Sequence, residues 1–524
     1  MQMQSEKAAL IILDGFGITP EKEGNAILMA KIPYIRKLFS SYPKALLKAS
    51  GQEAGLPWGE VGNSEVGHTN IGLGRIVLQD LPQIDKAISE KKLQEKQTVK
   101  DAIAQIQEKK SNLHIIGLLS DGAIHCHINH LSALIEVFKV VGCKIFLHLI
   151  ADGRDVPEKS IEKYVDTISK QLNENVAIAS LSGRYFAMDR DKNWDRIQSA
   201  YDAILQNGKF KESDIANGIK SAYARGETDE FISPTTIENN DVPNLGNDIF
   251  IFANYRSDRA IQLTRAFVDN SLSEVNKKGV ASNFITMTTY DDNLGTKVLF
   301  SNLDLNDQTT NPLTNPLPQI IAEGDLSQYH IAETEKYAHV TYFFAGGVKD
   351  PYKNQENKLF DSAKVKSHDL YPQMRAAEIT KETIVNLDKN YNLIVMNYAN
   401  CDMVGHSGNL EGAIKTVEVI DFCLGKLIPA LIESGYSIVL TSDHGNCDEM
   451  INLKSKKPNK EHTLNPVPLL LIKKDNAGGY SSFDELFSSE PIGVLADIAP
   501  TILPCLSIQA ATEMTGMDLL NSLS

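Results

Sequence analysis

The chain has 524 residues, a length that favours two large domains over a single core. Its 67 acidic side chains outnumber its 52 basic ones, and the net charge of -15 argues against binding to nucleic acid or to an anionic membrane surface. The apolar fraction of 42%, with no apolar stretch long enough to cross a bilayer, excludes a membrane-spanning protein and indicates a soluble globular one.

The first predicted element is a strand over residues 8–13, which leads directly into Asp14. This apolar run is too short for the core of a signal peptide. The six cysteines are widely spaced and form neither a CxxC pair nor a dense framework, which is typical of reduced thiols. Together these features predict a cytoplasmic protein.

The next segment, GLPWGEVGNSEVGHTNIGLGR, is a glycine-punctuated turn that contains Ser64. Asn63 and Ser64 are expected to open a helix here, which places the serine hydroxyl at the positive end of the helix. Coordination to a divalent cation would make such a hydroxyl a competent nucleophile. The alternative is that Ser64 is merely an N-cap, a position that serine favours. We interpret His68, in the same segment, as structural.

Through the rest of the chain, short apolar runs alternate with segments of helical period, the pattern of parallel sheets covered by helices. In such sheets the ligand lies beyond the carboxyl ends of the strands, so the residues just after each run are of interest. A charged residue or a histidine follows each of them. These residues are Asp14, Asp121, His125, Asp152, Arg154, Asp155, Arg184, Arg256, Arg259, Asp402, His406, Asp443 and His444.

Two segments indicate domain boundaries. Residues 301–318, with the sequence SNLDLNDQTTNPLTNPLP, are rich in Asn, Asp and Pro and suit neither strand nor helix. A second boundary is expected at RIVLQDLP, where a strand-like piece stops at Pro82. If both are boundaries, the middle part of the chain is an insertion.

One set of these residues has the chemistry of a metal site. Its carboxylates and imidazoles, without thiolates, suit Mn(II), Zn or Mg rather than a structural zinc cage. The set consists of Asp14, Asp402, His406, Asp443, His444 and His462. With a serine oxygen added, these residues could hold two ions. The alternative for any single member is an Asp that caps a helix or a His that is a satisfied core residue.

A second set has the chemistry of an anion pocket. Turns after several strands supply guanidinium groups that can grip phosphate and carboxylate bidentately. These arginines are Arg154, Arg184, Arg190, Arg256 and Arg259. The alternative is a solvated face on which the arginines pair with acidic neighbours. Lys336 is a weaker indication, because a lysine before a strand is usually exposed.

The motifs GNSEVGH, SDGAIHCHINH, ADGRD, GRYFAMDRD, AETEKYAHVTYFFAGG, NYANCDMVGHSGN and SDHGNCDEM together resemble those of the cofactor-independent phosphoglycerate mutases, members of the alkaline phosphatase superfamily. The resemblance runs nearly end to end. It implies an α/β fold of two domains, in which an alkaline-phosphatase-like doubly wound sheet is split in sequence by an inserted α/β transferase domain. We therefore expect a metal-binding phosphatase-like domain at residues 1–78 and 312–524 and a substrate domain at residues 79–311.

The resemblance also implies an activity, the interconversion of 3-phosphoglycerate and 2-phosphoglycerate in glycolysis and gluconeogenesis through a phosphoserine intermediate, without 2,3-bisphosphoglycerate. Asp14, Ser64, Asp443 and His444 match the ligands of one ion, and Asp402, His406 and His462 match those of a second. The substrate-binding positions matched are His125, Arg154, Asp155, Arg184, Arg190, Arg256, Arg259 and Lys336.

Several roles follow from the same resemblance. Ser64 is the expected nucleophile, Asp155 the expected general base for the second hydroxyl, and Lys336 is expected to stabilise charge on the phosphoryl oxygens. Mn(II) is the expected ion, with Zn, Co and Mg as alternatives. The family further implies a monomer that closes at a hinge between its domains to exclude water.

Three rival interpretations stay open. A metal-dependent phosphomonoesterase or sulfatase would share the metal set and Ser64, but it has less need for an inserted arginine-bearing domain. A phosphopentomutase should lack the DGRD motif and the arginines. A noncatalytic sensor predicts a missing ligand or nucleophile, and none is missing. The chain departs from the family at Ala123, Cys126, Cys401 and Leu464, none of which is a ligand or an arginine, and Cys126 is interpreted as a small buried thiol.

Overall fold

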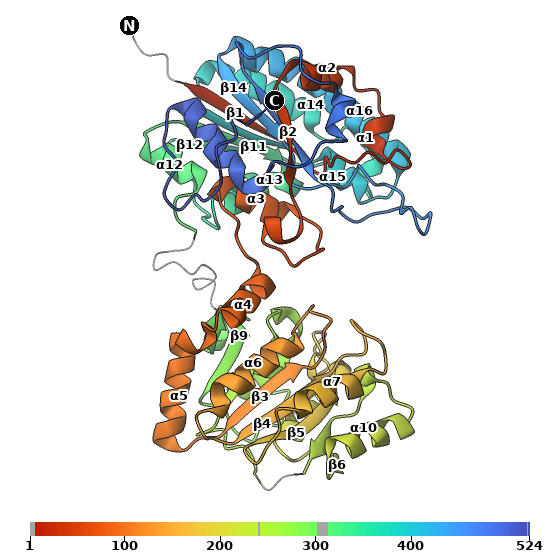
Figure 1. The fold of residues 1–524 in the computed structure, drawn as a ribbon, viewed down its shortest axis with the longest axis vertical. Coiled ribbons are helices and arrows are strands. Elements are labelled where there is room, and N and C mark those ends of the chain that lie inside the picture. The colour runs from red at the N-terminus through yellow and green to blue at the C-terminus, as the bar shows by residue number, and fades with distance from the viewer. Residues whose placement is uncertain (1–5, 239–240, 301–312, 521, 524) are drawn as a thin grey trace. The chain divides into compact units, whose positions relative to one another are not determined.

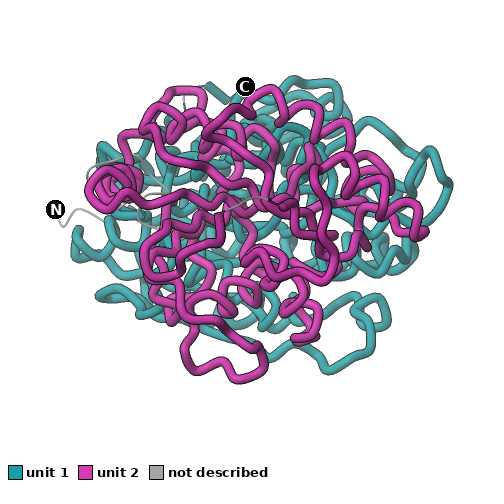
Figure 2. Tube along the Cα trace, turned by 90° about the horizontal axis from the view of Figure 1, so that it is seen from below, with its two compact units in different colours: residues 1–79, 308–524 teal, residues 80–307 magenta. Residues whose placement is uncertain are grey.

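The computed structural model describes residues 6–238, 241–300, 313–520 and 522–523. The chain divides into two compact units, which Figure 1 and Figure 2 show. Unit 1 comprises Met1–Gln79 and Gln308–Ser524, and unit 2 comprises Asp80–Asp307. Most of the linker expected at residues 301–318, including the boundary at residue 312, lies outside the described residues. The expected α/β architecture is confirmed, because each unit is built on its own sheet.

The sheet of unit 1 has, within the described ranges, eight strands in the order β12-β11-β13-β1-β14-β15-β2-β16. In chain order these are β1 (Lys7–Leu13), β2 (Lys44–Lys48), β11 (Gln328–Glu333), β12 (Gln355–Phe360), β13 (Leu393–Tyr398), β14 (Tyr436–Thr441), β15 (Val467–Ile472) and β16 (Gly493–Val494). The pairings from β12 to β14 are parallel, whereas β15 runs antiparallel to both β14 and β2.

Helices cover both faces of this sheet (Figure 1). They are α1 (Ala26–Met29), α2 (Pro33–Ser41), α3 (Ser64–Leu73), α12 (Leu317–Glu323), α13 (Thr334–Ala338), α14 (Ala376–Val385), α15 (Asn400–Gly405), α16 (Leu410–Glu433), α17 (Phe483–Leu486) and α18 (Ile498–Ile502). The side chains of β1 explain the two layers. Ala9, Ile11 and Leu13 pack into one buried cluster, and the alternate residues of the strand pack into another on the opposite face. Such a continuous apolar strand is typical of a parallel sheet buried on both sides.

The sheet of unit 2 has, in the described part of the chain, the strand order β10-β9-β8-β3-β4-β5-β7-β6. Its strands are β3 (Leu113–Leu118), β4 (Ile145–Ala151), β5 (Val176–Gly183), β6 (Phe210–Glu212), β7 (Thr235–Ile237), β8 (Ile249–Phe252), β9 (Phe284–Thr288) and β10 (Lys297–Phe300). The β5–β7 pairing is antiparallel and the other pairings are parallel.

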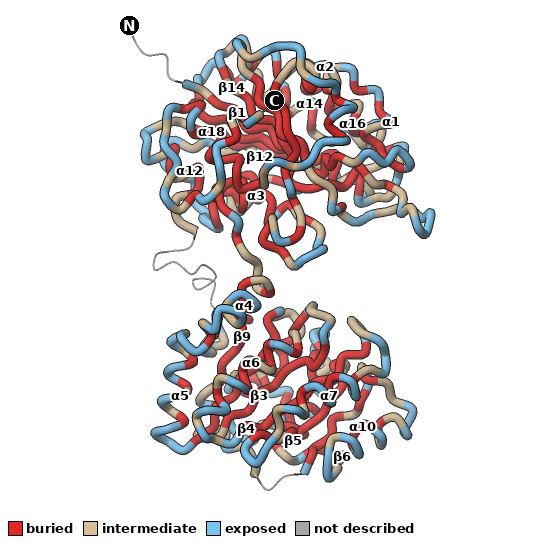
Figure 3. Tube along the Cα trace, viewed as in Figure 1, coloured by how far each residue is buried: buried red, intermediate tan, exposed pale blue. Residues whose placement is uncertain are grey.

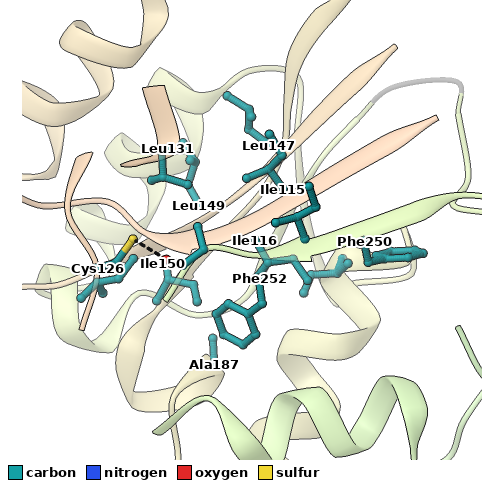
Figure 4. Close-up of a cluster of buried hydrophobic side chains, with 14 of the residues drawn as sticks. Ile115, Ile116, Cys126, Leu131, Leu147, Leu149, Ile150, Ala187, Phe250 and Phe252 are labelled. Carbon is teal, nitrogen blue, oxygen red and sulfur yellow. Dashed lines mark hydrogen bonds between the residues drawn. The ribbon is translucent and has the colours of Figure 1, made fainter. Parts of the chain in front are cut away.

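The helices of unit 2 are α4 (Asp80–Ser89), α5 (Gln97–Lys109), α6 (Ile128–Lys139), α7 (Ile161–Ser169), α8 (Arg184–Ala187), α9 (Trp194–Ile204), α10 (Ile215–Ala224) and α11 (Ile261–Val268). Burial concentrates on the central strands of each unit, drawn in red in Figure 3. The core of unit 2 includes Cys126 together with Ile116, Leu131 and Phe252, which Figure 4 labels. Burial raises the pKa of the Cys126 thiol to about 12, so the thiol is neutral at physiological pH. No helix among the described residues is long and apolar enough to span a membrane.

In each unit this topology places the candidate functional side chains at the carboxyl ends of the strands. Parallel strands end on the same side of the sheet, and ligands of such sheets bind there. In unit 1, β1 ends just before Asp14, β13 leads into the helix that carries Asp402, and β14 leads into Asp443. In unit 2, β4 ends just before Asp152, and β5 leads straight into Arg184.

Candidate active site

The nucleophile expected from the sequence is the first residue of α3, and it is not the cap of that helix. Asn63 is the N-cap, and its side chain accepts a hydrogen bond of 3.0 Å from the backbone N–H of Val66. The Ser64 hydroxyl is therefore free for other partners, which removes the interpretation of Ser64 as a simple cap. Gly67 lets the helix approach its neighbours, since a Cβ there would lie 2.8 Å from the carbonyl oxygen of Asp443.

Three polar groups converge on the buried Ser64 hydroxyl. Lys336 Nζ donates to Oγ at 2.6 Å, His444 Nε2 lies 2.9 Å away, and Asp14 Oδ1 lies 3.3 Å away. The same ammonium lies 2.7 Å from Asp14 Oδ1 and 2.6 Å from Asp402 Oδ2. These side chains come from five segments of the chain, around residues 14, 64, 336, 402 and 444, and the fold of unit 1 brings them together.

The other side chains expected as metal ligands form two groups in the same unit. Asp14, Asp443 and His444 form one, and Asp402, His406 and His462 form the other; within each group the possible ligand atoms lie within 4.8 Å of one another. In the second group the two Nε2 atoms lie 3.0 Å apart, and Asp402 Oδ1 lies 3.2 Å from that of His406 and 3.0 Å from that of His462.

The imidazoles of these groups are oriented by the backbone. His406 Nδ1 pairs with the carbonyl of Lys460 at 2.7 Å, His462 Nδ1 with that of Gly62 at 2.7 Å, and His444 Nδ1 with that of Gly445 at 3.3 Å. A nitrogen next to a carbonyl carries the proton, so each ring presents an unprotonated Nε2 to the centre of its group. Histidines that bind metals are oriented in this way.

The charge balance of the site fits divalent cations. Three buried carboxylates, Asp14, Asp402 and Asp443, face one ammonium, and Asp443 Oδ2 has no hydrogen-bond partner in the described structure. Burial and then the negative charge of Asp443 raise the pKa of Asp14 to about 7, although the Lys336 ammonium acts in the opposite direction. Burial alone would also raise the pKa of Asp402, but the Lys336 ammonium holds it well below its usual value. Bound cations would neutralise this excess of negative charge.

His68 also lies within this site, although we interpreted it from the sequence as structural. It is fully buried, and its Nδ1 lies 2.9 Å from the carbonyl oxygen of Ser64 and 3.2 Å from Asp443 Oδ2. Its Nε2 lies 3.0 Å from Asn397 Nδ2, which in turn donates to Asp14 Oδ2 at 2.7 Å. The spacing of four residues from Ser64 in a helix is the signal that could have placed His68 beside the nucleophile.

The substrate-binding residues expected from the sequence, apart from Lys336, lie in unit 2 and form one cluster. Arg184 is its buried centre. Its guanidinium donates to Asp152 Oδ1 at 2.6 Å and also to Asp155. Asp152 further accepts the Ser120 hydroxyl at 2.7 Å and the backbone N–H groups of Arg154 and Asp155 at 3.2 and 3.0 Å. One carboxylate thus holds the whole DGRD turn in place.

A second carboxylate, Asp258, gathers the remaining cationic groups. It lies 2.8 Å from Arg190, 3.2 Å from Arg256 and 3.6 Å from His125 Nδ1. Burial and then Arg184 lower the pKa of His125 to about 4, so this ring is neutral near pH 7. The pKa of Arg259 is lowered by burial and then by the nearby Arg190, Arg184 and Arg154, which shows how closely the positive charges are packed. Arg259 also donates to the carbonyl of Met188 at 3.3 Å.

This cluster has the character of an anion site. Five arginines and one histidine lie together; Arg184 is buried among them, and the about half-exposed Arg154, Arg190 and Arg256 pair with Glu230 or Asp258. Asp152 and Asp258 were given no role from the sequence. Their position inside the ADGRD and NYRSDRA motifs could have indicated them. The neighbouring sequence, however, does not show that a carboxylate there faces inward.

Two family models match parts of this chain. The family model described as BPG-independent PGAM N-terminus matches residues 84–292, and the model described as type I phosphodiesterase / nucleotide pyrophosphatase matches residues 279–483. A Clostridium perfringens (strain SM101 / Type A) protein named 2,3-bisphosphoglycerate-independent phosphoglycerate mutase is 43% identical over 526 residues, which cover 99% of this chain and 100% of the relative. A Clostridium acetobutylicum protein of the same name is 42% identical over 525 residues, with the same coverage of both chains.

Among solved structures, the phosphoglycerate mutase of Leishmania mexicana, crystallised at low cobalt concentration, is 28% identical to this chain with a TM-score of 0.56. The match covers 99% of this chain and 98% of that one. Because relatives at 43% and 42% identity match nearly every residue of both chains, this chain belongs to the family of the 2,3-bisphosphoglycerate-independent phosphoglycerate mutases.

Proposed function

We propose that this protein interconverts 3-phosphoglycerate and 2-phosphoglycerate through a phosphoserine on Ser64, with two divalent cations and without 2,3-bisphosphoglycerate. The observation that supports it most directly is the surroundings of one hydroxyl. Ser64 Oγ lies within 3.3 Å of a lysine, a histidine and an aspartate, beside two groups of ligand-type side chains. The curated relatives are named for this reaction.

The residues of unit 1 divide between the two cations in this proposal. Asp14, Ser64, Asp443 and His444 hold one, and Asp402, His406 and His462 hold the other. The donor set of carboxylate, imidazole and hydroxyl suits Mn(II), with Zn, Co and Mg as alternatives. When bound, such cations lower the pKa of a coordinated hydroxyl and offset charge on phosphoryl oxygens.

The transfer itself is the work of Ser64 and its neighbours. Ser64 Oγ gives up its proton, with Asp14 Oδ1 as the neighbouring acceptor at 3.3 Å, and attacks the phosphorus of 3-phosphoglycerate. The bond from phosphorus to the glycerate 3-oxygen breaks, and that oxygen takes up one proton in place of the one that Ser64 lost. The Lys336 ammonium stays protonated, because the carboxylates around it raise its pKa despite its burial, and it can follow the negative charge from Oγ to the phosphoryl oxygens.

The residues of unit 2 hold the glycerate in this proposal. Arg154, Arg184, Arg190, Arg256 and Arg259, together with His125, bind its carboxylate and phosphate. Asp155 takes the proton of the 2-hydroxyl, whose oxygen then attacks the phosphoserine and releases Ser64. We accordingly assign unit 1 as the metal-binding phosphatase-like domain and unit 2 as the substrate domain.

The test follows the phosphorus. Purified protein is incubated with 3-phosphoglycerate and Mn(II), without 2,3-bisphosphoglycerate, and phosphorus NMR records the products for the wild type and for Ser64→Ala. Thr69→Ala is the matched control, since Thr69 is a partly exposed hydroxyl residue of the same helix whose side chain donates to the carbonyl of Glu65. We expect 2-phosphoglycerate from the wild type and the Thr69 variant and none from Ser64→Ala. Inorganic phosphate as the main product would make the protein a phosphomonoesterase instead, and inertness with every cation would make it a sensor.

We also propose that the protein acts in the cytoplasm as a monomer. Its six cysteines are free thiols, five of them buried, as expected for a reducing compartment. Light scattering after gel filtration measures the oligomeric state, and a mass well above 57.8 kDa would contradict the monomer.

A further inference from the structure

Two buried residues outside the proposed ligand set, His68 on α3 and Asn397 on β13, link the nucleophile to the metal ligands by hydrogen bonds. Both are fully buried. Asn397 Nδ2 lies 2.7 Å from Asp14 Oδ2 and 3.0 Å from His68 Nε2. The argument below rests on the proposed function, because it assumes that Asp14 and Asp443 hold a cation.

The chemistry of these contacts sets the direction of each hydrogen bond. The amide nitrogen of Asn397 is the atom that lies 2.7 Å from Asp14 Oδ2, so its NH₂ donates to this carboxyl oxygen. The second hydrogen of that NH₂ points to His68 Nε2, which must then be unprotonated. The ring proton of a neutral histidine is consequently on Nδ1.

The proton on Nδ1 faces the nucleophile and the second carboxylate. Nδ1–H donates to the carbonyl oxygen of Ser64 at 2.9 Å, and Asp443 Oδ2 lies 3.2 Å from the same nitrogen. A continuous chain of hydrogen bonds therefore runs from Asp14 through Asn397 and His68 to the backbone of Ser64, with Asp443 beside it. Its members come from the loop after β1, from β13, from α3 and from the loop after β14, so it connects separate segments of the site.

We propose that His68 and Asn397 are positioning residues, which hold Asp14, Asp443 and Ser64 at the spacing that one cation requires. Both ring nitrogens of His68 and the NH₂ of Asn397 are used in these contacts, whereas the buried Oδ1 of Asn397 has no hydrogen-bond partner among the described residues. They act as the outer partners of metal ligands do, and loss of such partners typically weakens metal binding by about 10- to 100-fold. In the described structure no side chain of the second ligand group, Asp402, His406 and His462, is hydrogen-bonded to His68 or Asn397, so the affinity of that group for a cation should stay the same.

The test measures binding of Mn(II) alone by calorimetry, in a His406→Ala background that leaves the Asp14, Asp443 and His444 group as the remaining site. His68→Asn keeps a donor near the position of Nδ1 but lacks an acceptor for Asn397, and Asn397→Leu removes the amide. Each should weaken Mn(II) binding by about 10- to 100-fold. The double variant should be no weaker than the weaker single one, since both changes break the same chain.

His330→Asn is the matched control, because His330 is an equally buried histidine of unit 1 that pairs with Val340 and Gln328. It should lower the melting temperature as the His68 variant does. Its Mn(II) affinity should stay within about threefold of that of the His406→Ala protein, a smaller change than the loss of an outer partner causes. A second readout needs no metal. Nitrogen-15 NMR of the metal-free wild type should show His68 with its proton on Nδ1, and a proton on Nε2 would overturn the proposal.

The failure of this inference differs from the failure of the proposed function. If the His406→Ala protein binds no Mn(II), or binds it equally well after Asp443→Asn, the assigned metal site is wrong. If Asp443→Asn abolishes binding but His68→Asn and Asn397→Leu change it less than about threefold, the metal site stands and the positioning role falls.

Discussion

The buried carboxyl of Glu333 should make unit 1 less stable at alkaline pH. Glu333 is the last residue of β11 and the N-cap of α13, the helix that carries Lys336. Its side chain is fully buried and accepts hydrogen bonds from the Ser362 hydroxyl at 2.9 Å and the backbone N–H of Arg375 at 3.4 Å. These neutral donors compensate only part of the lost hydration, so burial raises the pKa of Glu333 to about 7.

The free-energy cost of ionising Glu333 in the folded protein follows from the difference between its folded and unfolded pKa values. A rise from the usual 4.5 to about 7 corresponds to about 3 kcal/mol. The folded state binds the proton more tightly than the unfolded state, so this contribution to stability is present below pH 4.5 and is lost as the pH rises through 7. Glu333→Gln keeps an acceptor for Arg375 and a partner for Ser362 without the charge. It should stabilise unit 1 by about 3 kcal/mol at pH 8 and by less than about 1 kcal/mol at pH 5.

Hydrogen exchange with mass spectrometry can measure this difference on peptides from β11 and β13. Peptides from unit 2 in the same sample are the internal reference, and Glu335→Gln is the control, since Glu335 is an exposed glutamate two residues away. The control should change opening free energies by less than about 0.5 kcal/mol. An equal gain for Glu333→Gln at both pH values, or no gain at pH 8, would refute the reasoning.

Three further changes test other parts of the molecule. Lys336→Met leaves Asp14, Asp402 and Asp443 without their ammonium, so the rate of phosphoryl transfer should fall at least about 100-fold in a coupled turnover assay, and an unchanged rate would contradict the role of Lys336. Arg184→Lys replaces the guanidinium whose Nη1 donates to both Asp152 and Asp155, and the KM for 3-phosphoglycerate should rise at least about tenfold. Arg225→Lys, at the Glu227 pair of the same unit, is the control, and equal effects would argue against an anion pocket. His148 is buried against His114 and Ser180, and burial lowers its pKa well below 6.5. Its neutral form thus stabilises unit 2 above pH 6.5, and this stability is lost as the pH falls. His148→Gln should therefore flatten the fall in the unit 2 melting temperature between pH 6.5 and 5, and a slope equal to that of the wild type would show that protons bind elsewhere.

Sequence patterns alone predicted the architecture and the chemical inventory of this protein. Apolar runs such as those of β1 and β13, each followed by a charged residue, indicate parallel strands whose ends carry function, because local hydrophobicity reports burial directly. The motifs around Ser64, Asp155 and Asp443 identified the family, which the full-length relatives confirm. Features that depend on a few neighbouring residues could therefore be predicted from the sequence alone.

Contacts between distant segments were decided by the tertiary structure. The antiparallel entry of β15 between β14 and β2, and the capping of α3 by Asn63, depend on partners that local periodicity does not specify. The link from His68 to Asn397 joins residues 329 positions apart, and Asp258 gathers side chains from three separate turns. The sequence does not show whether a polar residue of a motif faces solvent or another side chain. Only the packing of the folded protein decides which polar atoms are buried together, and so which residues position the site.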